Sequence, residues 1–402
     1  MFAECALSRD NVMRILCVHQ GFELYGSDRC FAESLQAIRK LFPTAKICAV
    51  IPRDGPLAAL LRPFADELRI APLWVLRKRG FGRLLASAPF TFPLAFVRAI
   101  AGFRANDLVY INTVTVLDHL LAAAFFRRKA LLHVHEAPAG LIGLGFAALV
   151  RAVGAPTIFN SEATRRAYRP DDHMPNYVLY NGVQDPLTTS LSDYDGKTRR
   201  LRLLMIGRLS HAKGQDLLID ACGLLPPFCL EKIEVRIVGG SFGAQSRLED
   251  ELRCRAKNLG RPELFSFEPF VDDPSALYDW CDLAVVPSRV REGFGRIPVE
   301  AMAHGRASIV AAHGGLPEIV TNEATGWHFA PGDARDLAAV ICRAALSSEK
   351  VRRFGEAGRR RFKKRFTAAQ IERRLQAIVR QRMVAPNSRG TSCPMQEPQL
   401  LP

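Results

Sequence analysis

Short β-branched or apolar runs, each followed by an amphipathic segment of helix length, recur from one end of this chain to the other. This alternation predicts an α/β protein in which helices cover parallel sheets. In the first half, strands are predicted at Arg14–His19, Lys46–Ile51, Asp107–Ile111, Ala130–His135, Thr157–Asn160 and Tyr177–Tyr180. In the second half, they are predicted at Leu201–Ile206, Ile233–Gly239, Leu264–Phe267, Leu283–Pro287, Ser308–Ala312 and Gly326–Phe329.

Each half therefore has the pattern of a separate doubly wound domain, and a length of 402 residues suits two or three domains. Residues 184–200 are polar and strand-free, as expected of a linker. We expect a first domain at 1–183, a second at 201–365, a C-terminal helix at 366–384 and a disordered tail at 385–402.

The chain carries 55 Lys and Arg against 40 Asp and Glu, a net charge of +15. This excess makes an acidic partner plausible, whether nucleic acid, anionic lipid or a phosphorylated metabolite. Most of the excess lies in residues 351–382, which hold 12 Lys and Arg and 2 Glu. That segment could bind nucleic acid, or it could be an exposed helix with a solvated charged face.

The stretch Leu68–Asn106 contains no acidic residue and mixes seven basic side chains with aromatic and apolar ones. A segment of this kind can lie in a lipid interface without spanning it, and it can equally be a loop and helix whose aromatic residues belong to the core. Its longest uncharged run is broken by Pro89 and Pro93, so we expect no transmembrane helix.

The ten cysteines are scattered, with no C-x-x-C pair and no histidine at zinc-ligand spacing. Most lie in apolar runs, where a free cysteine behaves as a small hydrophobic residue. The first residues show no secretory signal. These features favour a reducing, cytoplasmic location.

Ligands of doubly wound sheets bind beyond the carboxyl ends of the strands. After the first strand, a loop with Gly21 and Gly26 precedes an amphipathic helix, which suits either a plain turn or the close approach of a ligand. His135 and Glu136 follow the strand that begins at Ala130. His135 could orient a sugar hydroxyl, or it could be a structural histidine between domains.

Two loops of the second half carry more specific signals. After Leu201–Ile206, Arg208 and Lys213 stand directly before a helix, so a guanidinium, an ammonium and helix amides could together hold a diphosphate. After Leu283–Pro287, Glu292 precedes Gly293-Phe294-Gly295, and Glu300 falls in the first turns of the helix that follows. Carboxylates beside amides that face an anion suggest a ligand that also has hydroxyl groups, such as a nucleotide sugar.

At these residues the chain resembles the retaining GT-B glycosyltransferases of glycosyltransferase family 4, the group 1 transferases, over nearly all of Met13–Arg382. The match is specific in the second half, where it includes the E-x(7)-E pair, the G-R-L-x-x-x-K-G run, Val271–Leu283 and the later G-G-L-P-E. The first half matches more loosely, through Tyr25-Gly26-Ser27-Asp28-Arg29, His135-Glu136 and Asn181-Gly182-Val183.

The resemblance implies two Rossmann-like domains facing across a cleft, with the C-terminal helix crossing back to the first domain. Arg208 and Lys213 would hold the donor diphosphate, and Glu300 would bind the ribose. Glu292 and the backbone of Gly293, Phe294 and Gly295 would contact the transferred sugar and the phosphates. Gly26 would line the acceptor side, and His135 would lie near the reacting sugar. The chain departs from the family at Tyr25-Gly26, where one glycine stands in place of a glycine pair, and in Arg296, which replaces an apolar residue.

The implied reaction is front-face transfer of a sugar from a nucleoside diphosphate, with retention, to a glycan or lipid-linked acceptor of bacterial cell-surface glycan or glycolipid synthesis. Arg208, Lys213 and a helix N-terminus can stabilise the leaving diphosphate, so we expect no metal and no separate cofactor. The alternatives are a GT-B sugar phosphorylase or synthase and a nucleic-acid-binding protein, although the second leaves the E-G-F-G motif without a role. We therefore expect no nucleic-acid partner, a cytoplasmic location, and peripheral contact with an anionic inner-membrane surface.

Overall fold

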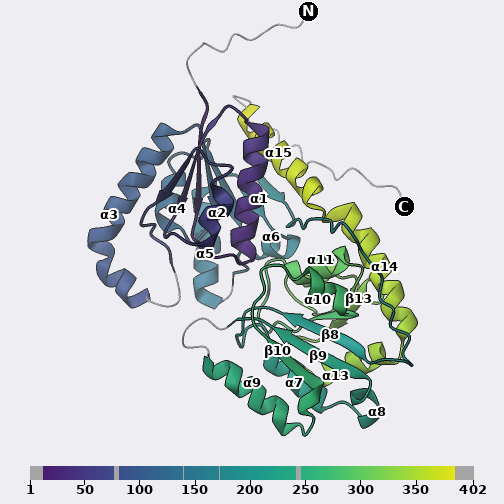
Figure 1. Cartoon of the computed structure of the whole chain (residues 1–402). Coiled ribbons are helices and arrows are strands. Elements are labelled where there is room, and N and C mark those ends of the chain that lie inside the picture. Colours follow the sequence, from purple (N-terminus) through teal and green to yellow (C-terminus); the bar gives the residue numbers. More distant parts are fainter. Residues whose placement is uncertain (1–11, 77–80, 139, 172, 241–245, 385–402) are drawn as a thin grey trace, which may run out of the picture. The chain divides into compact units, whose positions relative to one another are not determined.

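The computed structural model describes residues 12–384 except 77–80, 139, 172 and 241–245 (Figure 1). It divides into two compact units. The first unit comprises Met1–Asn160, Arg165–Leu179 and Glu372–Pro402, and the second comprises Ser161–Thr164 and Tyr180–Ile371. The predicted disordered tail and the start of the chain lie outside the described residues, as do Arg77, Lys78 and Arg79.

In the first unit, a seven-stranded parallel sheet has the order β3-β2-β1-β4-β5-β6-β7. Its strands are β1 (Arg14–His19), β2 (Lys46–Ile51), β3 (Glu67–Ile70), β4 (Leu108–Asn112), β5 (Ala130–Val134), β6 (Thr157–Phe159) and β7 (Asn176–Val178). The helices are α1 (Gly26–Leu41), α2 (Pro56–Leu61), α3 (Phe81–Ala105), α4 (Leu117–Ala123), α5 (Gly140–Val153) and α6 (Glu162–Tyr168). Strands β1, β4 and β5 are almost wholly buried, which explains why their apolar runs were visible in the sequence.

In the second unit, a six-stranded parallel sheet has the order β10-β9-β8-β11-β12-β13. Its strands are β8 (Leu201–Ile206), β9 (Ile233–Val238), β10 (Phe265–Glu268), β11 (Leu283–Val286), β12 (Ala307–Ala311) and β13 (Gly326–Phe329). The helices are α7 (Gln215–Gly223), α8 (Pro227–Leu230), α9 (Ser246–Asn258), α10 (Ser275–Trp280), α11 (Arg296–Ala303), α12 (Leu316–Ile319), α13 (Ala334–Ala345), α14 (Ser348–Arg365) and the start of α15 (Ala368–Val384), with a short 3-10 turn η1 at Pro262–Leu264. The predicted α/β architecture with two doubly wound units is confirmed.

The long helix α15 begins in the second unit, and its residues from Glu372 onward belong to the first. Within the first unit, Gln376 Nε2 donates to the carbonyl of Ala37 at 3.1 Å, and Lys40 Nζ lies 2.8 Å from Glu372 Oε2. The end of α15 therefore packs along α1.

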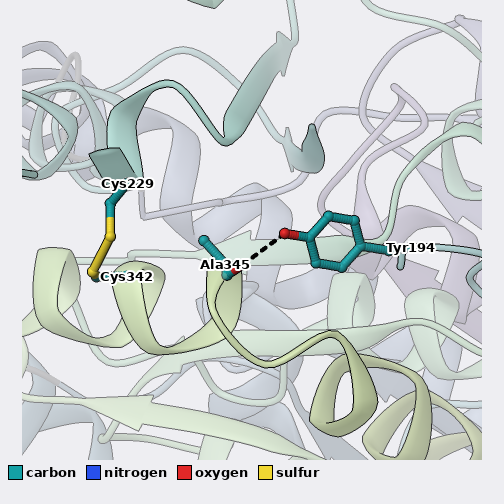
Figure 2. The surroundings of a disulfide bond; sticks show 4 residues. All are labelled: Tyr194, Cys229, Cys342 and Ala345. Carbon is teal, nitrogen blue, oxygen red and sulfur yellow. Dashed lines mark hydrogen bonds between the residues drawn. A yellow bond between two sulfur atoms is a disulfide. The ribbon is translucent and has the colours of Figure 1, made fainter. Parts of the chain in front are cut away.

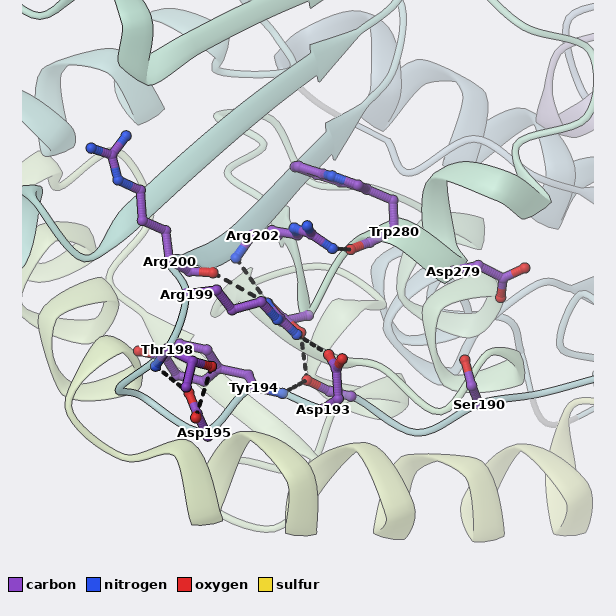
Figure 3. A network of polar contacts seen from close by, with 12 residues as sticks. Ser190, Asp193, Tyr194, Asp195, Thr198, Arg199, Arg200, Arg202, Asp279 and Trp280 are labelled. Atoms are coloured by element: carbon purple, nitrogen blue, oxygen red, sulfur yellow. Dashed lines mark hydrogen bonds and ion pairs between the residues drawn. The ribbon is translucent and has the colours of Figure 1, made fainter.

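Residues 184–200 do not form the separate linker that their polarity predicted. Ser192 and Tyr194 are buried in the second unit, and Tyr194 donates its hydroxyl to the carbonyl of Ala345 at 2.6 Å (Figure 2). The guanidinium of Arg199 pairs with buried Asp282 at 2.6 Å, and Figure 3 shows Arg199 in its network of polar contacts. This polar segment is therefore attached to the second unit by charge-assisted hydrogen bonds and is not a solvated linker.

Helix α3 bears on the expectation that the chain has no transmembrane helix. This helix continues through Pro89 and Pro93, which lie on its exposed side, where water can bond the carbonyls that lose their backbone partners. Its residues Ala86–Ala105 are long and apolar enough to cross a membrane by length and composition. A core helix of a soluble protein passes the same test, so this is weak evidence for a span.

One disulfide bond could not be predicted from the spacing of the cysteines. Cys229, in α8, and Cys342, in α13, form a disulfide across 113 residues of sequence (Figure 2). Neither cysteine has a neighbouring cysteine in the sequence, so only the packing of the two helices brings them together. The scattered cysteines favoured a reducing location, whereas this pair is oxidised.

Three arginines of the basic segment 351–382 are engaged in structural contacts, and most of its other basic side chains are exposed. Arg361 donates to the carbonyls of Glu318 and Ile319 at 2.7 and 2.8 Å, and Arg359 pairs with Asp185 at 2.5 Å. The guanidinium of Arg365 lies over the ring of Tyr180, 5.5 Å from its centroid. These contacts agree with the interpretation of the segment as a structural helix with a charged face.

Candidate active site

An ion pair joins the two most specific loops of the second unit. Lys213 Nζ lies 2.7 Å from Glu292 Oε1, and Ser288 donates its hydroxyl to the same carboxylate. The Glu292 side chain is only 14% exposed. The sequence predicted each of these loops separately, and the structure places Lys213 and Glu292 in direct contact.

The electrostatic state of Glu292 follows from these partners. Burial by itself raises the pKa of its carboxyl group, but the nearby Lys213 ammonium and the hydrogen bonds from Lys213 and Ser288 outweigh burial. The result is a pKa below the ordinary value, so Glu292 remains ionised at neutral pH. It is suited to orient Lys213 or to accept hydrogen bonds from hydroxyl groups, and not to donate a proton.

A buried glutamine shapes the loop that carries Arg208. Gln215, at the start of α7, donates to the carbonyl of Arg208 at 3.0 Å and accepts from the backbone N–H of Ser210 at 3.3 Å. The loop therefore has a fixed backbone, and Arg208 projects from it as an exposed side chain. Arg208 and Lys213 thus stand on one rigid loop after β8.

The E-G-F-G segment is fixed mainly through its backbone. The carbonyl of Gly293 accepts from Thr164 Oγ1 at 3.2 Å. Phe294 is 2% exposed and its ring lies 5.7 Å from that of Tyr180, so the side chain belongs to the core and only its backbone could contact a ligand. Gly314 has φ +62°, and a Cβ there would lie 2.4 Å from the carbonyl oxygen of Glu292. The G-G-L-P-E segment therefore packs directly against this loop.

The second carboxylate of the motif has its own partners. Tyr278 donates its hydroxyl to Glu300 Oε2 at 2.8 Å, and Arg296 Nε lies 3.4 Å from Glu300 Oε1. Gly295 precedes α11, so Glu300 lies in the second turn of that helix. The structure therefore places Glu292 and Glu300 in two different hydrogen-bond networks, and Arg296, the departure from the family pattern, belongs to the second.

A histidine that the sequence analysis did not select lies beside Glu292. His313 Nε2 faces the carbonyl of Ser288 at 2.9 Å, so this nitrogen carries the hydrogen in the neutral ring. Its Nδ1 is buried and has no hydrogen-bond partner among the described residues. His313 therefore offers an unused acceptor next to the Lys213–Glu292 pair.

In the first unit, His135 belongs to a polar cluster at the carboxyl ends of the strands. Its Nε2 lies 2.8 Å from Asn112 Oδ1. Asn112 Nδ2 faces His19 Nδ1 at 3.0 Å and the carbonyl of Ser27 at 3.5 Å, and because a carbonyl only accepts, the amide oxygen is the atom that faces His135. His135 therefore carries its hydrogen on Nε2. Burial lowers its pKa well below the ordinary value, so the ring is neutral with an acceptor at Nδ1.

A second pair holds the loop that contains Gly26. Asp28, in the first turn of α1, accepts from the backbone N–H of Tyr25 at 2.9 Å and lies 2.7 Å from His19 Nε2. A Cβ on Gly21 would overlap Asp28, so only glycine fits beneath this pair. Gly26 is the first residue of α1 and is positioned by this arrangement.

Two further residues of this cluster carry signs of constraint. Thr113 has φ 141°, unusual for a β-branched residue, and its hydroxyl bonds to Glu136. Burial raises the pKa of Glu136, against the opposing effect of that hydrogen bond. Strained backbone and buried titratable groups at one sheet edge are typical of functional sites.

Several of these residues were not predicted from the sequence to be site residues. They are Gln215, Tyr278, Ser288 and His313 in the second unit, and His19, Asp28, Asn112, Thr113 and Glu136 in the first. Some signal was present, since Tyr278 lies in the family segment Val271–Leu283 and Glu136 follows His135 directly. The remaining residues each lie near the carboxyl end of a strand, but their partners come from distant parts of the chain. Within the described residues, no group of three or more His, Cys, Asp and Glu side chains is arranged to hold a metal ion.

Comparison with known families bears directly on the second unit. Residues 193–361 match the model of the family described as glycosyl transferases group 1. This stretch of the second unit is therefore similar to a glycosyl transferases group 1 domain. This domain begins within the segment expected to be a linker and contains Arg208, Lys213, Glu292, Glu300 and His313.

Curated proteins that resemble the chain have names that describe a sugar-phosphate synthase and a glycosyltransferase. Mannosylfructose-phosphate synthase of Agrobacterium fabrum is 26% identical over 301 residues, which cover 74% of this chain and 58% of that protein. D-inositol 3-phosphate glycosyltransferase of Thermomonospora curvata is 35% identical over 147 residues, which cover 35% of this chain and 34% of that protein. The chain thus spans between about a third and three fifths of these two curated relatives.

Solved structures extend the likeness beyond the group 1 domain. The structure of HepE from Anabaena, in complex with UDP and glucose, aligns with a TM-score of 0.75 at 24% identity. The alignment covers 92% of this chain and 100% of the HepE chain. The chain therefore has the two-unit α/β fold expected of a GT-B glycosyltransferase, including the first unit, which the family model does not reach.

Proposed function

We propose that this protein is a retaining glycosyltransferase that moves a sugar from a nucleoside-diphosphate sugar to a glycan or lipid-linked acceptor. The observation that carries the proposal is the Lys213–Glu292 pair, which lies with Arg208 on the strand-end loops of the group 1 domain. The relatives' names support it, because they describe a glycosyltransferase and a sugar-phosphate synthase.

The chemistry of the loops suits this reaction. Departure of a nucleoside diphosphate leaves negative charge on the phosphate oxygens, and cationic side chains on a fixed backbone stabilise that charge. Lys213 and Arg208 supply the cations, Gln215 fixes their loop, and Glu292 restrains the ammonium. We therefore propose that transfer needs neither a divalent metal nor a separate cofactor, and that Glu300 receives the ribose.

A donor screen tests the proposal first. The full chain is incubated with nucleotide sugars and its thermal unfolding is measured, because a ligand at 100 times its Kd stabilises the folded state by about 2.7 kcal/mol. Transfer is then assayed with the identified donor in the presence of a chelator, and the anomeric configuration of the product is read by NMR. Inversion, or an absolute requirement for a divalent ion, would contradict the proposed mechanism.

A GT-B sugar phosphorylase or synthase is the second candidate. It is favoured by the likeness to mannosylfructose-phosphate synthase, which matches more of this chain than the glycosyltransferase relative described above. Incubation of a glycoside with free phosphate, and of the nucleotide sugar with a sugar phosphate, separates the two candidates. Product formed with free phosphate identifies a phosphorylase, and product formed only with a glycan or lipid-linked acceptor supports the first candidate.

We further propose a place for the reaction at the cytoplasmic face of a bacterial inner membrane, in cell-surface polysaccharide or glycolipid synthesis. The support is the acid-free segment Leu68–Asn106, from which helix α3 exposes Phe90, Leu94 and Val97 to solvent. Apolar side chains on one helix face, flanked by basic residues, can insert into a lipid interface. Another curated relative, from Salmonella typhimurium, is named as a lipopolysaccharide N-acetylglucosaminetransferase.

Co-sedimentation with vesicles tests this location. We expect the chain to pellet with anionic vesicles at low salt and to be released by high salt, because each basic residue near an anionic surface contributes about 1 kcal/mol. The variant Phe90→Ser with Leu94→Ser should pellet less, whereas Phe228→Ser, an exposed aromatic residue of the second unit, should not change. Equal pelleting with neutral vesicles would argue against it.

A further inference from the structure

A groove in the first unit lies away from the residues described above. It has a volume of about 840 Å³ and runs between helix α3 and strands β1, β2 and β3. This size falls within the range of roughly 300–1,000 Å³ that is common for small-molecule sites. The groove reaches the amino ends of the strands, at Arg14 and Lys46, whereas His19 and His135 stand at or just beyond the carboxyl ends.

The topology of the sheet explains why this groove is open. The chain passes from β1 to β2 to β3 in one direction across the sheet, and then from β3 through α3 back to β4. Because such crossovers are right-handed, α1 and α2 cover one face and α3 lies on the other. Helix α3 packs near β1 and β4, as the closeness of Gly102 to Leu16 shows, so β2 and β3 at the sheet edge are left partly uncovered.

Side chains alternate between the two faces of a strand, and the side chains on one face give the groove an apolar floor and a charged mouth. Residues Lys46, Cys48 and Val50 share one face of β2, and Arg14 and Leu16 share the same face of β1. The charged residue of each strand comes first and the apolar residues follow. Helix α3, the long helix at the left of Figure 1, contributes small side chains that leave room, among them Ala95, Ala101 and Ala105.

Three cations of this lining have no counterion within the described part of the chain. Arg14, Lys46 and Arg98 are exposed, and their side chains make no ion pair or hydrogen bond with any residue that the structure describes. Arg14 and Lys46 are partners in the register of β1 and β2, so they stand side by side at the mouth.

The acidic residues of the lining are already engaged. Asp66 pairs with Arg39 at 2.5 Å, and Glu67 pairs with Arg69 at 2.5 Å. Asp118 is buried and accepts from the backbone of Trp74 and of His119. The groove therefore presents an excess of positive charge above an apolar floor.

We propose that this groove binds one anionic lipid, with its acyl chain along the floor and its anionic head on Arg14 and Lys46. Both halves of the groove argue for this occupant, because a free phosphate needs no apolar floor and a neutral lipid needs no cations. The inference deepens the membrane contact proposed above and rests on it, since a bilayer would supply the lipid. It is independent of which sugar is transferred.

Binding of single lipids in solution tests the proposal. Palmitoyl lysophosphatidylglycerol and palmitoyl lysophosphatidylcholine, each below its micelle concentration, are titrated into the full chain by calorimetry, and inorganic phosphate serves as the head-only probe. We expect the anionic lysolipid to bind at least about tenfold more tightly than the zwitterionic one, because two cations face its head. Equal affinity for both lysolipids, or equal binding of inorganic phosphate, would overturn the proposal.

Matched variants locate the site. Arg14→Gln with Lys46→Gln should remove the preference for the anionic lysolipid, whereas Arg62→Gln with Arg128→Gln, two exposed cations outside the lining, should retain it. Ala101→Trp should fill the groove and abolish binding of both lysolipids, whereas Leu94→Trp on the exposed face of the same helix should not. Circular dichroism checks that each variant folds, and the glutamine variants, which are at exposed positions, decide the question if Ala101→Trp does not.

The two proposals fail differently. Vesicle co-sedimentation without binding of the monomeric lysolipid would leave the membrane contact standing and remove the groove as a lipid site. Lysolipid binding that persists in Ala101→Trp would place the lipid elsewhere. Lysolipid binding that depends on Arg14 and Lys46, without any pelleting on vesicles, would support the groove and remove the membrane contact.

Discussion

Asn112 Oδ1 lies 2.8 Å from His135 Nε2, and the carbonyl of Ser27 fixes the orientation of that amide. The side chain of Asn112 therefore determines which nitrogen of His135 carries the hydrogen. The opposite nitrogen, Nδ1, is left as an acceptor toward the carboxyl edge of the sheet. This relationship gives the predicted site histidine a defined tautomer before any substrate is bound.

Nitrogen NMR of the histidine rings should accordingly show His135 as the neutral Nε2–H tautomer at pH 7. Asn112→Ala removes the acceptor and should give a mixture of tautomers. The variant Asn112→Ala should also lower kcat/KM by up to about tenfold, since a hydrogen bond of this kind contributes about 0.5–1.5 kcal/mol. Asn106→Ala, whose side chain bonds only within helix α3, should leave the His135 signals unchanged. An Nδ1–H form of His135 in the unaltered protein would refute the assignment.

Removal of the ion pair of the second unit should weaken transfer severely. Lys213→Ala, Arg208→Ala, Glu292→Ala and Glu300→Ala each remove a group assigned to the donor, and each should cost about 2–5 kcal/mol in binding or transition-state stabilisation. The fold should persist because none of these side chains forms the core. Steady-state kinetics with the identified donor measure the loss, and near-normal turnover of both Arg208→Ala and Lys213→Ala would remove the diphosphate assignment.

Tyr278 should matter for donor binding through Glu300. Tyr278→Phe removes the hydroxyl that donates to Glu300 Oε2 and should raise KM for the donor about threefold to tenfold, with little change in kcat. Tyr194→Phe is the matched control, because it loses an equally buried hydroxyl contact, to Ala345, in the same unit. That control should lower the free energy of unfolding by about 1 kcal/mol without affecting KM. A similar KM for both variants would assign Tyr278 a structural role only.

Stability should fall as the pH falls below about 6.5, in part because of His133. Burial lowers the pKa of His133 to about 3. Between pH 6.5 and 3, the unfolded chain therefore binds a proton at this residue that the folded chain does not, so stability decreases with decreasing pH by up to about 1.4 kcal/mol per pH unit. Urea unfolding at pH 7 and 5 should show a smaller decrease for His133→Gln than for exposed His211→Gln. Equal decreases for both variants would contradict a neutral buried His133.

The segment once expected to be a linker should prove to be part of the second unit. Asp282 is 1% exposed and holds Arg199, Ser192 and the backbone of Arg202. Asp282→Asn removes the buried one of the two carboxylates that pair with Arg199, leaving only the exposed Asp193, and should lower the free energy of unfolding by about 3–5 kcal/mol. Asp195→Asn, at an exposed position in the same segment, should lower the free energy of unfolding much less. Similar unfolding midpoints in urea for the two variants would show that the network does not hold the segment.

The sequence determined the elements whose signals are local. Strands β1, β2, β8 and β13 have the predicted bounds, because their buried runs are apolar throughout or nearly so. The edge strand β3 was not predicted, since Glu67–Ile70 is mostly exposed and has no apolar run. The loops with Lys213 and Glu292 were found because glycine, proline and charge at fixed spacing encode a strand-to-helix turn by themselves.

Only the tertiary structure decided which distant residues meet. The contacts Lys213–Glu292, Asn112–His135 and Cys229–Cys342 join residues 79, 23 and 113 positions apart, and no local pattern encodes such pairs. The order of the strands made the difference, because it brings the carboxyl ends of separate strands to one edge and leaves β2 and β3 uncovered beside α3. The sequence thus determined which groups the site could use, and the parallel packing of the strands determined their partners.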